Sequence, residues 1–368
     1  MGEPIRVLHV LQRMEAGGTQ ALLMNIYRNI DRKKVQFDFL VEYSNKQFYD
    51  DEIKKLGGKI YYTTVKEDNN IIKFNKDVKK VLVENNYKII HVHTYSIGYF
   101  VLKTAKKSGV PIRIAHSHNN ATVHDYKYLL KLFMQKIYTI YANQLFACSE
   151  EAGKYLFKNK PFKVLKNAID SEKFVYNNEI SESIRKKLGI AENFVVGHVG
   201  RFHEQKNHMF LLEVFKEIKN KKGNAKLILI GTGPLETEIK KKVKKLNLEN
   251  DVIFLGNISN VNELYQAMDV FVLPSLFEGL GIVAIEAQAA GLPVVTSTGV
   301  AKDAIVTSNI VQISLDAPIE EWVNTICEIK VNDKNLVIDN IKNAGYDIEE
   351  NAKKMQEFYI DKYNLLNI

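Results

Sequence analysis

Segments typical of β-strands alternate with segments typical of α-helices along the whole 368-residue chain. The strand-like segments are short and rich in Val, Ile, Leu and Phe, and turn residues separate many of them from an amphipathic segment. They are residues 5–11, 35–41, 59–63, 89–92, 112–115, 145–148, 163–166, 194–199, 226–230, 252–255, 270–273, 294–296 and 310–313. This alternation predicts an α/β fold of parallel sheets with helices on both faces.

A stretch without clear periodicity divides the pattern into two halves. Residues 167–178 are rich in turn formers, so we expect the linker between two domains there. The strand–helix alternation restarts after this stretch, and the chain is long enough for two domains of ordinary size. The sequence therefore predicts two similar domains, 1–168 and 169–350, followed by a C-terminal helix within 351–368.

The composition is that of a globular protein without a membrane-spanning segment. Hydrophobic residues make up 46% and charged residues 26% of the chain, and no apolar run approaches the ~20 residues that a bilayer requires. The N-terminus lacks the pattern of a signal peptide. Cys148 and Cys327 form no CxxC pair, so we expect neither a disulfide framework nor a cysteine-based zinc site, and a cytoplasmic location fits.

Positive charge is concentrated in the first half of the chain. Residues 1–170 contain 28 Lys and Arg against 16 Asp and Glu, a net charge of +12, whereas the remainder carries −4. An anionic partner would explain this: a phosphorylated acceptor, an acidic membrane surface or nucleic acid. A genome composition that favours Lys and Asn would explain it equally well.

The most informative loop lies between the strand at 270–273 and an Ala-rich helix at 282–290. Pro274 ends the strand, and a glycine-rich turn follows, so the unpaired amides of the helix start point beyond the strand end. A phosphate group is the usual occupant of such a place. Glu278 and Glu286 would be roughly 12 Å apart on a helix, too far for a glycosidase pair. They could hold two ends of a long phosphate-bridged ligand, or be ordinary turn and helix residues.

Two further loops have the same strand–loop–helix order. Gly17 and Gly18 precede Thr19, the expected N-cap, and form either an anion-facing loop or a simple tight turn. Arg201 and Lys206 share the loop after the strand at 194–199, with Asn207 as the expected cap of the next helix. These two cations could neutralise a diphosphate or simply be exposed.

Four histidines stand at the ends of two predicted strands of the first half. His91 and His93 come at the end of one strand, and His116 and His118 at the end of the next. The spacing of His116 and His118 puts both imidazoles on one face, which a metal ion could use, but no third ligand is obvious. Hydrogen bonding to sugar hydroxyls, or a purely structural pair, are the alternatives.

A segment at 126–141 combines aromatic and aliphatic residues with Lys127, Lys131 and Lys136. The lysines recur at roughly helical spacing, so they could form a basic stripe beside an apolar one. A peripheral membrane helix has this pattern, and so does an ordinary helix packed on a core.

Together these motifs resemble the retaining nucleotide-sugar glycosyltransferases of family 4, over essentially the full length of the chain. The resemblance rests on Glu278-x7-Glu286 within Pro-Ser-x-x-Glu-Gly-x-Gly, on Gly200-Arg201 with Lys206, on Gly231-x-Gly233-Pro234, and on Gly17-Gly18. The Ile-Ala-His-Ser-His-Asn run at 114–119 looks most like the bacterial capsule and exopolysaccharide transferases. The chain departs from the family at Ala168, where an Asn-Gly turn is usual, and at 300–303, where Gly-Gly and Glu are common.

The resemblance implies the GT-B fold, in which two Rossmann-like domains face each other across a cleft and the C-terminal helix packs back on the first domain. It implies that Arg201 and Lys206 hold the donor diphosphate, that Glu278 binds the donor sugar, and that Glu286 binds the ribose. His118 matches the acceptor-domain histidine near the reacting sugar. The other implied donor-binding residues are Gly17, Gly18, Gly231, Gly233, Ser275, Gly279, Leu280, Gly281, Ile282 and Val283, and the acceptor-side candidates are His93, His116 and Asn119.

The predicted function is transfer of a sugar from a UDP-sugar, with retention, to a glycan or lipid-linked acceptor in capsule or exopolysaccharide synthesis. The chain contains no Asp-x-Asp motif, so we expect no metal or other cofactor, and Arg201, Lys206 and the helix start would neutralise the diphosphate. A UDP-sugar epimerase of similar fold and a non-catalytic transferase subunit remain alternatives. No nucleic-acid motif is present. We expect a cytoplasmic protein, with contact to the inner face of an anionic membrane as an option.

Overall fold

The computed structural model describes residues 3–15, 17–95, 97–118, 134, 137–258, 260–330 and 337–366. The chain forms two compact units. The first comprises Met1–Ile169 together with Asp347–Ile368, and the second comprises Asp170–Tyr346. The first boundary, after residue 169, lies one residue from the expected boundary after residue 168. The second, after residue 346, lies four residues from the expected boundary after residue 350.

The first unit is built on a seven-stranded parallel sheet in the order β3-β2-β1-β4-β5-β6-β7. Its strands are β1 (Ile5–Leu11), β2 (Val35–Val41), β3 (Ile60–Tyr62), β4 (Ile89–Val92), β5 (Ile112–Ser117), β6 (Gln144–Ala147) and β7 (Lys163–Val164). Around it are α1 (Gly18–Asn29), α2 (Asp50–Lys55), α3 (Val65–Asp68), α4 (Ile71–Glu84), α5 (Gly98–Lys107), η1 (Thr139–Tyr141) and α7 (Glu150–Phe157). The central strands are buried on both faces, which explains their nearly continuous apolar sequences.

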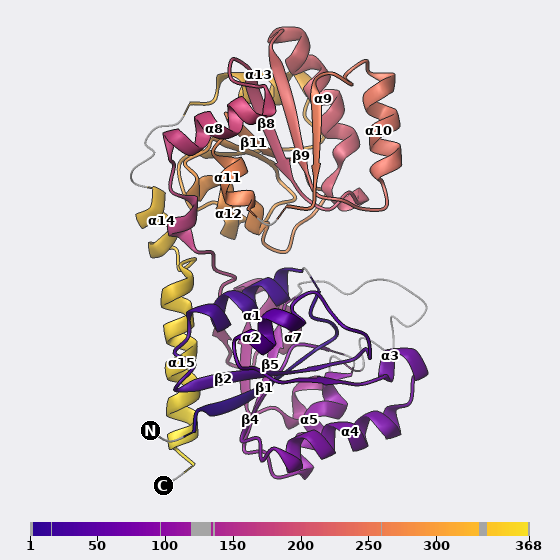
Figure 1. Ribbon diagram of the computed structural model, residues 1–368, viewed down its shortest axis with the longest axis vertical. Helices are drawn as coiled ribbons and strands as arrows, with labels where there is room; N and C mark the ends of the chain where they lie inside the picture. The colour runs from indigo at the N-terminus through magenta and orange to yellow at the C-terminus, as the bar shows by residue number, and fades with distance from the viewer. Residues whose placement is uncertain are drawn as a thin grey trace. The chain divides into compact units, whose positions relative to one another are not determined.

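The C-terminal helix α15 (Ile348–Asn364) belongs to the first unit and packs against α1, β1 and β2 (Figure 1). Asp347 caps its start by accepting a hydrogen bond from the Glu350 amide. Its inner face contributes Ile348, Ala352, Met355, Phe358 and Tyr359 to the core formed by β1, β2 and α1. The expected return of the last helix to the first domain is confirmed.

The second unit holds a six-stranded parallel sheet in the order β10-β9-β8-β11-β12-β13. Its strands are β8 (Phe194–Val199), β9 (Ala225–Ile230), β10 (Val252–Gly256), β11 (Val270–Leu273), β12 (Val294–Ser297) and β13 (Ile310–Ile313). Its helical segments are η2 (Ser171–Phe174), α8 (Asn178–Leu188), η3 (Glu204–Lys206), α9 (His208–Lys221), α10 (Glu236–Lys245), α11 (Val261–Tyr265), α12 (Ile282–Ala289), η4 (Lys302–Ala304), α13 (Ile319–Glu328) and α14 (Val337–Asn343). The predicted α/β fold with two parallel sheets is confirmed.

Two expected helix caps are wrong in detail. Helix α1 begins at Gly18 with Gly17 at the N-cap, so Thr19 lies inside the first turn. Asn207 does precede α9, but its side chain makes no capping hydrogen bond. Its φ of 54° places it in the left-handed conformation that ends η3, whereas a capping side chain needs an extended backbone.

Each sheet has one point at which the strand order reverses. In the first unit it lies between β1 and β4, and in the second between β8 and β11. Loops at the carboxyl ends of such neighbouring strands diverge and leave room for a ligand. Among the described residues, no helix is both long enough and apolar enough to cross a membrane.

Candidate active site

In the second unit, the loops after β8 and β9 contact each other closely at Gly200 and Gly231. Gly231 has a φ of +134°, and a Cβ atom there would lie 2.1 Å from the carbonyl oxygen of Gly200. A Cβ atom on Gly233 would lie 2.4 Å from the carbonyl oxygen of Phe202. Both positions therefore require glycine, and together they fix the course of the loop that carries Arg201 and Lys206.

An ion pair joins the loop after β8 to the loop after β11. The Lys206 ammonium lies 2.6 Å from Glu278 Oε1, and the Ser275 hydroxyl donates to the same oxygen at 2.6 Å. The side chains of Lys206 and Glu278 are only 16% and 8% exposed, so the pair is poorly screened by water. The order of the strands thus brings together three predicted site residues, Lys206, Ser275 and Glu278, although Lys206 and Glu278 are 72 residues apart in the sequence.

The backbone of these two loops is also joined by hydrogen bonds. The Leu276 amide donates to the Gln205 carbonyl at 2.8 Å, and the Gln205 side chain donates to the Phe277 carbonyl at 2.9 Å. The Glu278 amide donates to the Gly299 carbonyl at 2.8 Å. Both ends of the ion pair are therefore attached to a fixed backbone. Preorganised charges of this kind stabilise a developing charge without rearrangement.

Helix α12 starts beside the ion pair and leaves its first amides uncapped by any side chain. Gly281 at the N-cap has a φ of +79°, a left-handed conformation that favours glycine. The first residues of the helix are Ile282 and Val283, after the exposed Gly279 and the half-buried Leu280. The positive end of the helix dipole and these amides form a place for an anion next to Lys206.

Arg201 lies five residues before Lys206 in the same loop. Its side chain is exposed and forms no ion pair with the residues that the structure describes, whereas the Lys206 ammonium is engaged by Glu278. The two predicted cations therefore differ in this structure. Lys206 is held in place, and Arg201 is available to a ligand that arrives from solvent.

Glu286 lies in the second turn of α12, and the pKa of its carboxyl group is raised. Burial raises the pKa of its carboxyl group to about 7, and a hydrogen bond from the Tyr265 hydroxyl at 3.0 Å acts in the opposite direction. Tyr265 is fully buried at the end of α11. Sequence reasoning missed Tyr265, because neither its spacing nor its neighbours mark it as a partner of an acidic residue.

In the first unit, five histidines from three adjacent strands stack on one another and form two separate sets of hydrogen bonds, one of three rings and one of two; we call them the histidine ladder. His93 Nδ1 lies 2.8 Å from His118 Nε2, His93 Nε2 lies 3.1 Å from His9 Nδ1, and His91 Nε2 lies 3.0 Å from His116 Nδ1. The rings of His116 and His118 stack at 4.1 Å, on one face as their spacing predicts.

Burial keeps this histidine ladder uncharged at neutral pH. Burial lowers the pKa of His118 and of His9 to about 3, and the pKa values of the other three imidazoles lie well below their usual range. Sequence analysis did not single out His9, although it stands opposite His91 in the register of β1 and β4. Neutral imidazoles can accept and donate hydrogen bonds at once, as sugar hydroxyls require.

The remaining predicted positions of the first unit lie at the switch point or outside the described residues. Gly17 and Gly18 are exposed at the start of α1, and a Cβ atom on Gly18 would have only Asn167 Nδ2 near it, at 4.0 Å. Asn119 and the lysines at 127, 131 and 136 lie outside the part of the chain that the structure describes.

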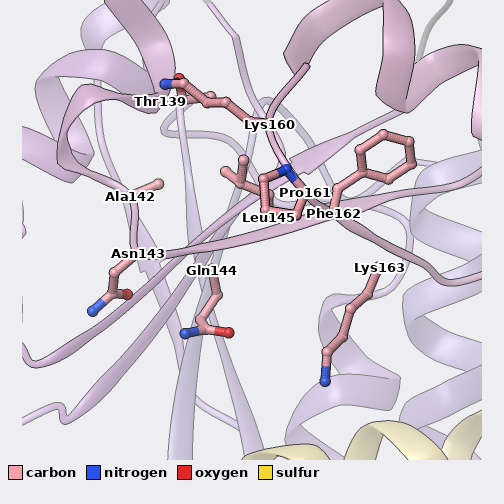
Figure 2. Close-up of a pocket in the computed structure, with 9 residues that line it drawn as sticks. All are labelled: Thr139, Ala142, Asn143, Gln144, Leu145, Lys160, Pro161, Phe162 and Lys163. Atoms are coloured by element: carbon pink, nitrogen blue, oxygen red, sulfur yellow. The ribbon is translucent and has the colours of Figure 1, made fainter. Parts of the chain in front are cut away.

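A separate cavity of about 420 Å³ opens near the amino ends of β6 and β7 (Figure 2). Its lining residues are Thr139, Ala142, Asn143, Gln144, Leu145, Lys160, Pro161, Phe162 and Lys163. None of them is a predicted site residue, since the predicted residues follow the carboxyl ends of strands. We therefore place the candidate site residues of each unit at the switch point of its own sheet rather than in this cavity.

Comparison with known proteins identifies the family. Residues 16–173 match the family model described as Glycosyltransferase Family 4, and residues 180–354 match that described as Glycosyl transferases group 1. The chain is 36% identical over 368 residues to the Bacillus subtilis (strain 168) protein named "Putative glycosyltransferase EpsF", with 96% of each chain covered.

Two further comparisons extend the likeness. The chain is 25% identical to the Escherichia coli UDP-Gal:alpha-D-GlcNAc-diphosphoundecaprenol alpha-1,3-galactosyltransferase, with 97% of each chain covered. The crystal structure of Anabaena Alr3699/HepE in complex with UDP superposes with a TM-score of 0.80 at 19% identity, covering 97% of this chain and 100% of that one. The chain belongs to the family 4 glycosyltransferases and has their GT-B fold.

Proposed function

We propose that this glycosyltransferase moves a sugar from a UDP-sugar to a hydroxyl group of a glycan or lipid-linked glycan in capsule or exopolysaccharide synthesis. The observation that carries the proposal is the Lys206–Glu278 pair beside the uncapped start of α12. This arrangement offers a cation, a carboxylate and free amides within one small region. A nucleoside diphosphate sugar needs all three, for its phosphates and for its sugar hydroxyls.

In the proposed mechanism, the second unit binds the donor and stabilises the leaving diphosphate. Lys206, Arg201 and the amides of Ile282 and Val283 would neutralise the charge that develops on the phosphate oxygens. Glu278 would accept hydrogen bonds from the donor sugar, and Ser275 would keep its carboxylate in place. These protein charges would replace a metal ion, so we propose metal-independent donor cleavage.

The acceptor side of the proposal rests on the first unit. His118 and the neutral imidazoles behind it offer hydrogen bonds to the reacting sugar or the acceptor hydroxyl. We propose that the anomeric configuration is retained, with the leaving phosphate as the base. The Escherichia coli relative is named for a diphosphoundecaprenol acceptor, and the basic first half suits such an anionic, membrane-bound acceptor. Peripheral contact with the cytoplasmic face of a membrane is part of this proposal.

The proposal is tested by nucleotide release from UDP-, GDP-, ADP- and CDP-sugars, each with EDTA present. We expect slow release from a UDP-sugar, unchanged by EDTA and lost in Glu278→Ala. A requirement for added metal would contradict charge neutralisation by Lys206 and Arg201. Interconversion of one UDP-sugar with its epimer, without UDP release, would favour an epimerase. Absence of both reactions would favour a non-catalytic subunit.

The raised pKa of Glu286 predicts that donor affinity depends on pH. Ribose hydroxyl groups donate to an ionised carboxylate, and this carboxyl group is protonated below about pH 7. We expect the affinity for a UDP-sugar to fall about tenfold for each pH unit below 7 and to level off above it. Calorimetric titration from about pH 6 to 8 measures this. A UDP-sugar is used because its diphosphate diester does not titrate in that range.

The matched variant for this titration is Glu286→Gln, which keeps the shape of the side chain but cannot ionise. Its affinity should be weak and independent of pH. A wild-type affinity that is also constant across the range would show that Glu286 does not bind the ribose in its ionised form.

A further inference from the structure

We infer that His198 is a positioning residue for Lys206, the cation that neutralises the leaving diphosphate in the proposed function. His198 lies near the carboxyl end of β8 and is completely buried. It is inaccessible to solvent and therefore to a donor, so it would act through Lys206 rather than touch the substrate. The inference rests on the proposed function and extends it from the residues that bind the donor to one that holds them in place.

His198 joins β8 to β11 where the pairing of their backbones ends. The backbone pairing of the two strands ends with Gly197 and Phe271. One residue further along, His198 Nδ1 donates a hydrogen bond to the carbonyl oxygen of Val272 at 2.8 Å. On its other side, β8 stays paired with β9 as far as Val199. The imidazole therefore takes the place of the backbone ladder at the switch point, and it fixes the separation of the strands that lead into the loops of the ion pair.

The same hydrogen bond determines which ring nitrogen carries the proton. A carbonyl oxygen can only accept, so His198 Nδ1 carries the proton and Nε2 carries a lone pair. His198 Nε2 is buried and has no hydrogen-bond partner among the described residues. Such an atom is unfavourable in a strand that is otherwise apolar, and leucine or phenylalanine would avoid it. A histidine at this position therefore indicates a role other than filling the core.

The imidazole and the Lys206 side chain pack against the same side of Gly200. A Cβ atom on Gly200 would lie 3.0 Å from His198 Nε2 and 3.1 Å from both Cγ and Cδ of Lys206. Burial, together with interactions with His208 and Lys206, lowers the pKa of His198 well below its usual range, so the ring is neutral and does not repel the ammonium. The ring therefore supports the stem of Lys206 while the ammonium is held 2.6 Å from Glu278 Oε1.

His208 encloses the imidazole from the other end of the same loop. It is the first residue of α9, and its ring centroid lies 4.7 Å from that of His198, with an angle of 79° between the planes. The ring of Phe202 lies 4.8 Å from His208. His198 thus contacts the loop that carries both cations at its start, beside Gly200, and at its end. We therefore expect a change at His198 to displace this loop rather than the rest of the sheet.

The test compares two substitutions that separate the hydrogen bond from the volume of the ring. His198→Asn keeps an N–H donor at the place of Nδ1 but leaves a cavity behind it, whereas His198→Leu fills more of the space and removes the donor. We expect His198→Leu to lower kcat for UDP release about 10–100-fold with little change in KM, and His198→Asn to stay within about threefold of wild type. A residue that only fills the core would give the opposite order, since the cavity should be more damaging.

The unfolding temperature of each variant is measured alongside its kinetics. If His198→Leu does not fold, His198→Gln takes its place in the comparison, because its amide group lies at the place of Nε2 rather than Nδ1. The same loss of kcat is expected for it. A loss in His198→Asn as large as in His198→Leu or His198→Gln would overturn the inference.

A double-mutant cycle with Lys206→Ala tests whether His198 acts through Lys206. His198→Leu should have little further effect when Lys206 is already absent, because the effects of residues that act as one unit do not add. The control is Ile218→Val, a substitution of a fully buried residue in α9, which should leave kcat unchanged in both backgrounds. Equal kcat for His198→Leu and wild type, or full addition of the two losses, would overturn the inference.

The affinity for UDP, measured by calorimetry, gives the same comparison without turnover. UDP is the leaving group whose charge Lys206 would neutralise. Its affinity should therefore fall in His198→Leu, be kept in His198→Asn, and be equal in Lys206→Ala and the double variant. Wild-type protein that binds UDP but releases none from UDP-sugars would contradict the proposed function and leave this comparison intact. A wild-type affinity in His198→Leu would contradict the inference alone.

Discussion

Lys206→Ala is expected to lower the rate of UDP release from the donor about 10²–10³-fold, mainly in kcat. Lys206 is the mostly buried cation beside the start of α12, and its ammonium is held 2.6 Å from Glu278 Oε1. Its loss removes charge stabilisation from the leaving diphosphate. It also leaves the Glu278 carboxylate without its cation in a region where the donor must place further negative charge.

The matched control is Lys219→Ala. Lys219 also pairs with a carboxylate, Asp251, at 2.9 Å, but Lys226 pairs with the same carboxylate at 3.0 Å, so the pairing survives the substitution. Asp251 directly precedes β10 and thus lies at the amino ends of the strands, opposite the loops that carry the site residues. Steady-state kinetics should show wild-type behaviour for Lys219→Ala. Similar rates for Lys206→Ala and wild type would contradict the role given to Lys206.

Removal of residues 347–368 is expected to prevent folding of the first unit. Helix α15 buries five core side chains, of which Ile348, Ala352 and Tyr359 are completely inaccessible. Truncating one large core side chain costs about 2–5 kcal/mol, and whole domains are stable by only about 5–15 kcal/mol. The loss should therefore exceed the stability of the unit. Circular dichroism and thermal denaturation of the truncated protein measure it.

A shorter deletion serves as the control for this experiment. Residues 365–368 follow α15, and Leu365 and Leu366 are 60% and 40% exposed. Their removal should leave the unfolding temperature within about 2 °C of wild type. A stable, cooperatively folded protein without residues 347–368 would show that α15 is dispensable to the core.

Strand positions were predictable because parallel strands buried on both faces have continuous apolar sequences. Strands β1, β2, β4, β8, β11 and β13 have the predicted bounds, and the other strands differ by one or two residues at one or both ends. Strand-to-helix loops were predictable for a related reason, since glycine and proline mark where a sheet ladder stops. Lys206 and Glu278 could be assigned to one region, but their direct contact depends on β8 and β11 being neighbours in the sheet.

Contacts between residues distant in sequence could not be read from local patterns. Tyr265 reaches Glu286 because α11 and α12 both pack against η2, and Tyr359 reaches His91 because the last helix returns to the first sheet. His93 was recognised from the sequence as a strand-end histidine, but only the pairing of β4 with β5 places it beside His118. The sequence pattern predicts which face of a helix or strand is apolar, whereas tertiary packing determines which faces contact each other.

Hydrogen–deuterium exchange with UDP, in the presence of EDTA, tests the central claim that the donor nucleotide is held at the carboxyl ends of β8, β9 and β11. We predict slower amide exchange at 200–206, 231–234 and 275–286 when UDP is added, and no such change in Lys206→Ala. Unchanged exchange in these loops, protection that appears only with added metal, or protection confined to the residues around the cavity of Figure 2 would contradict the claim.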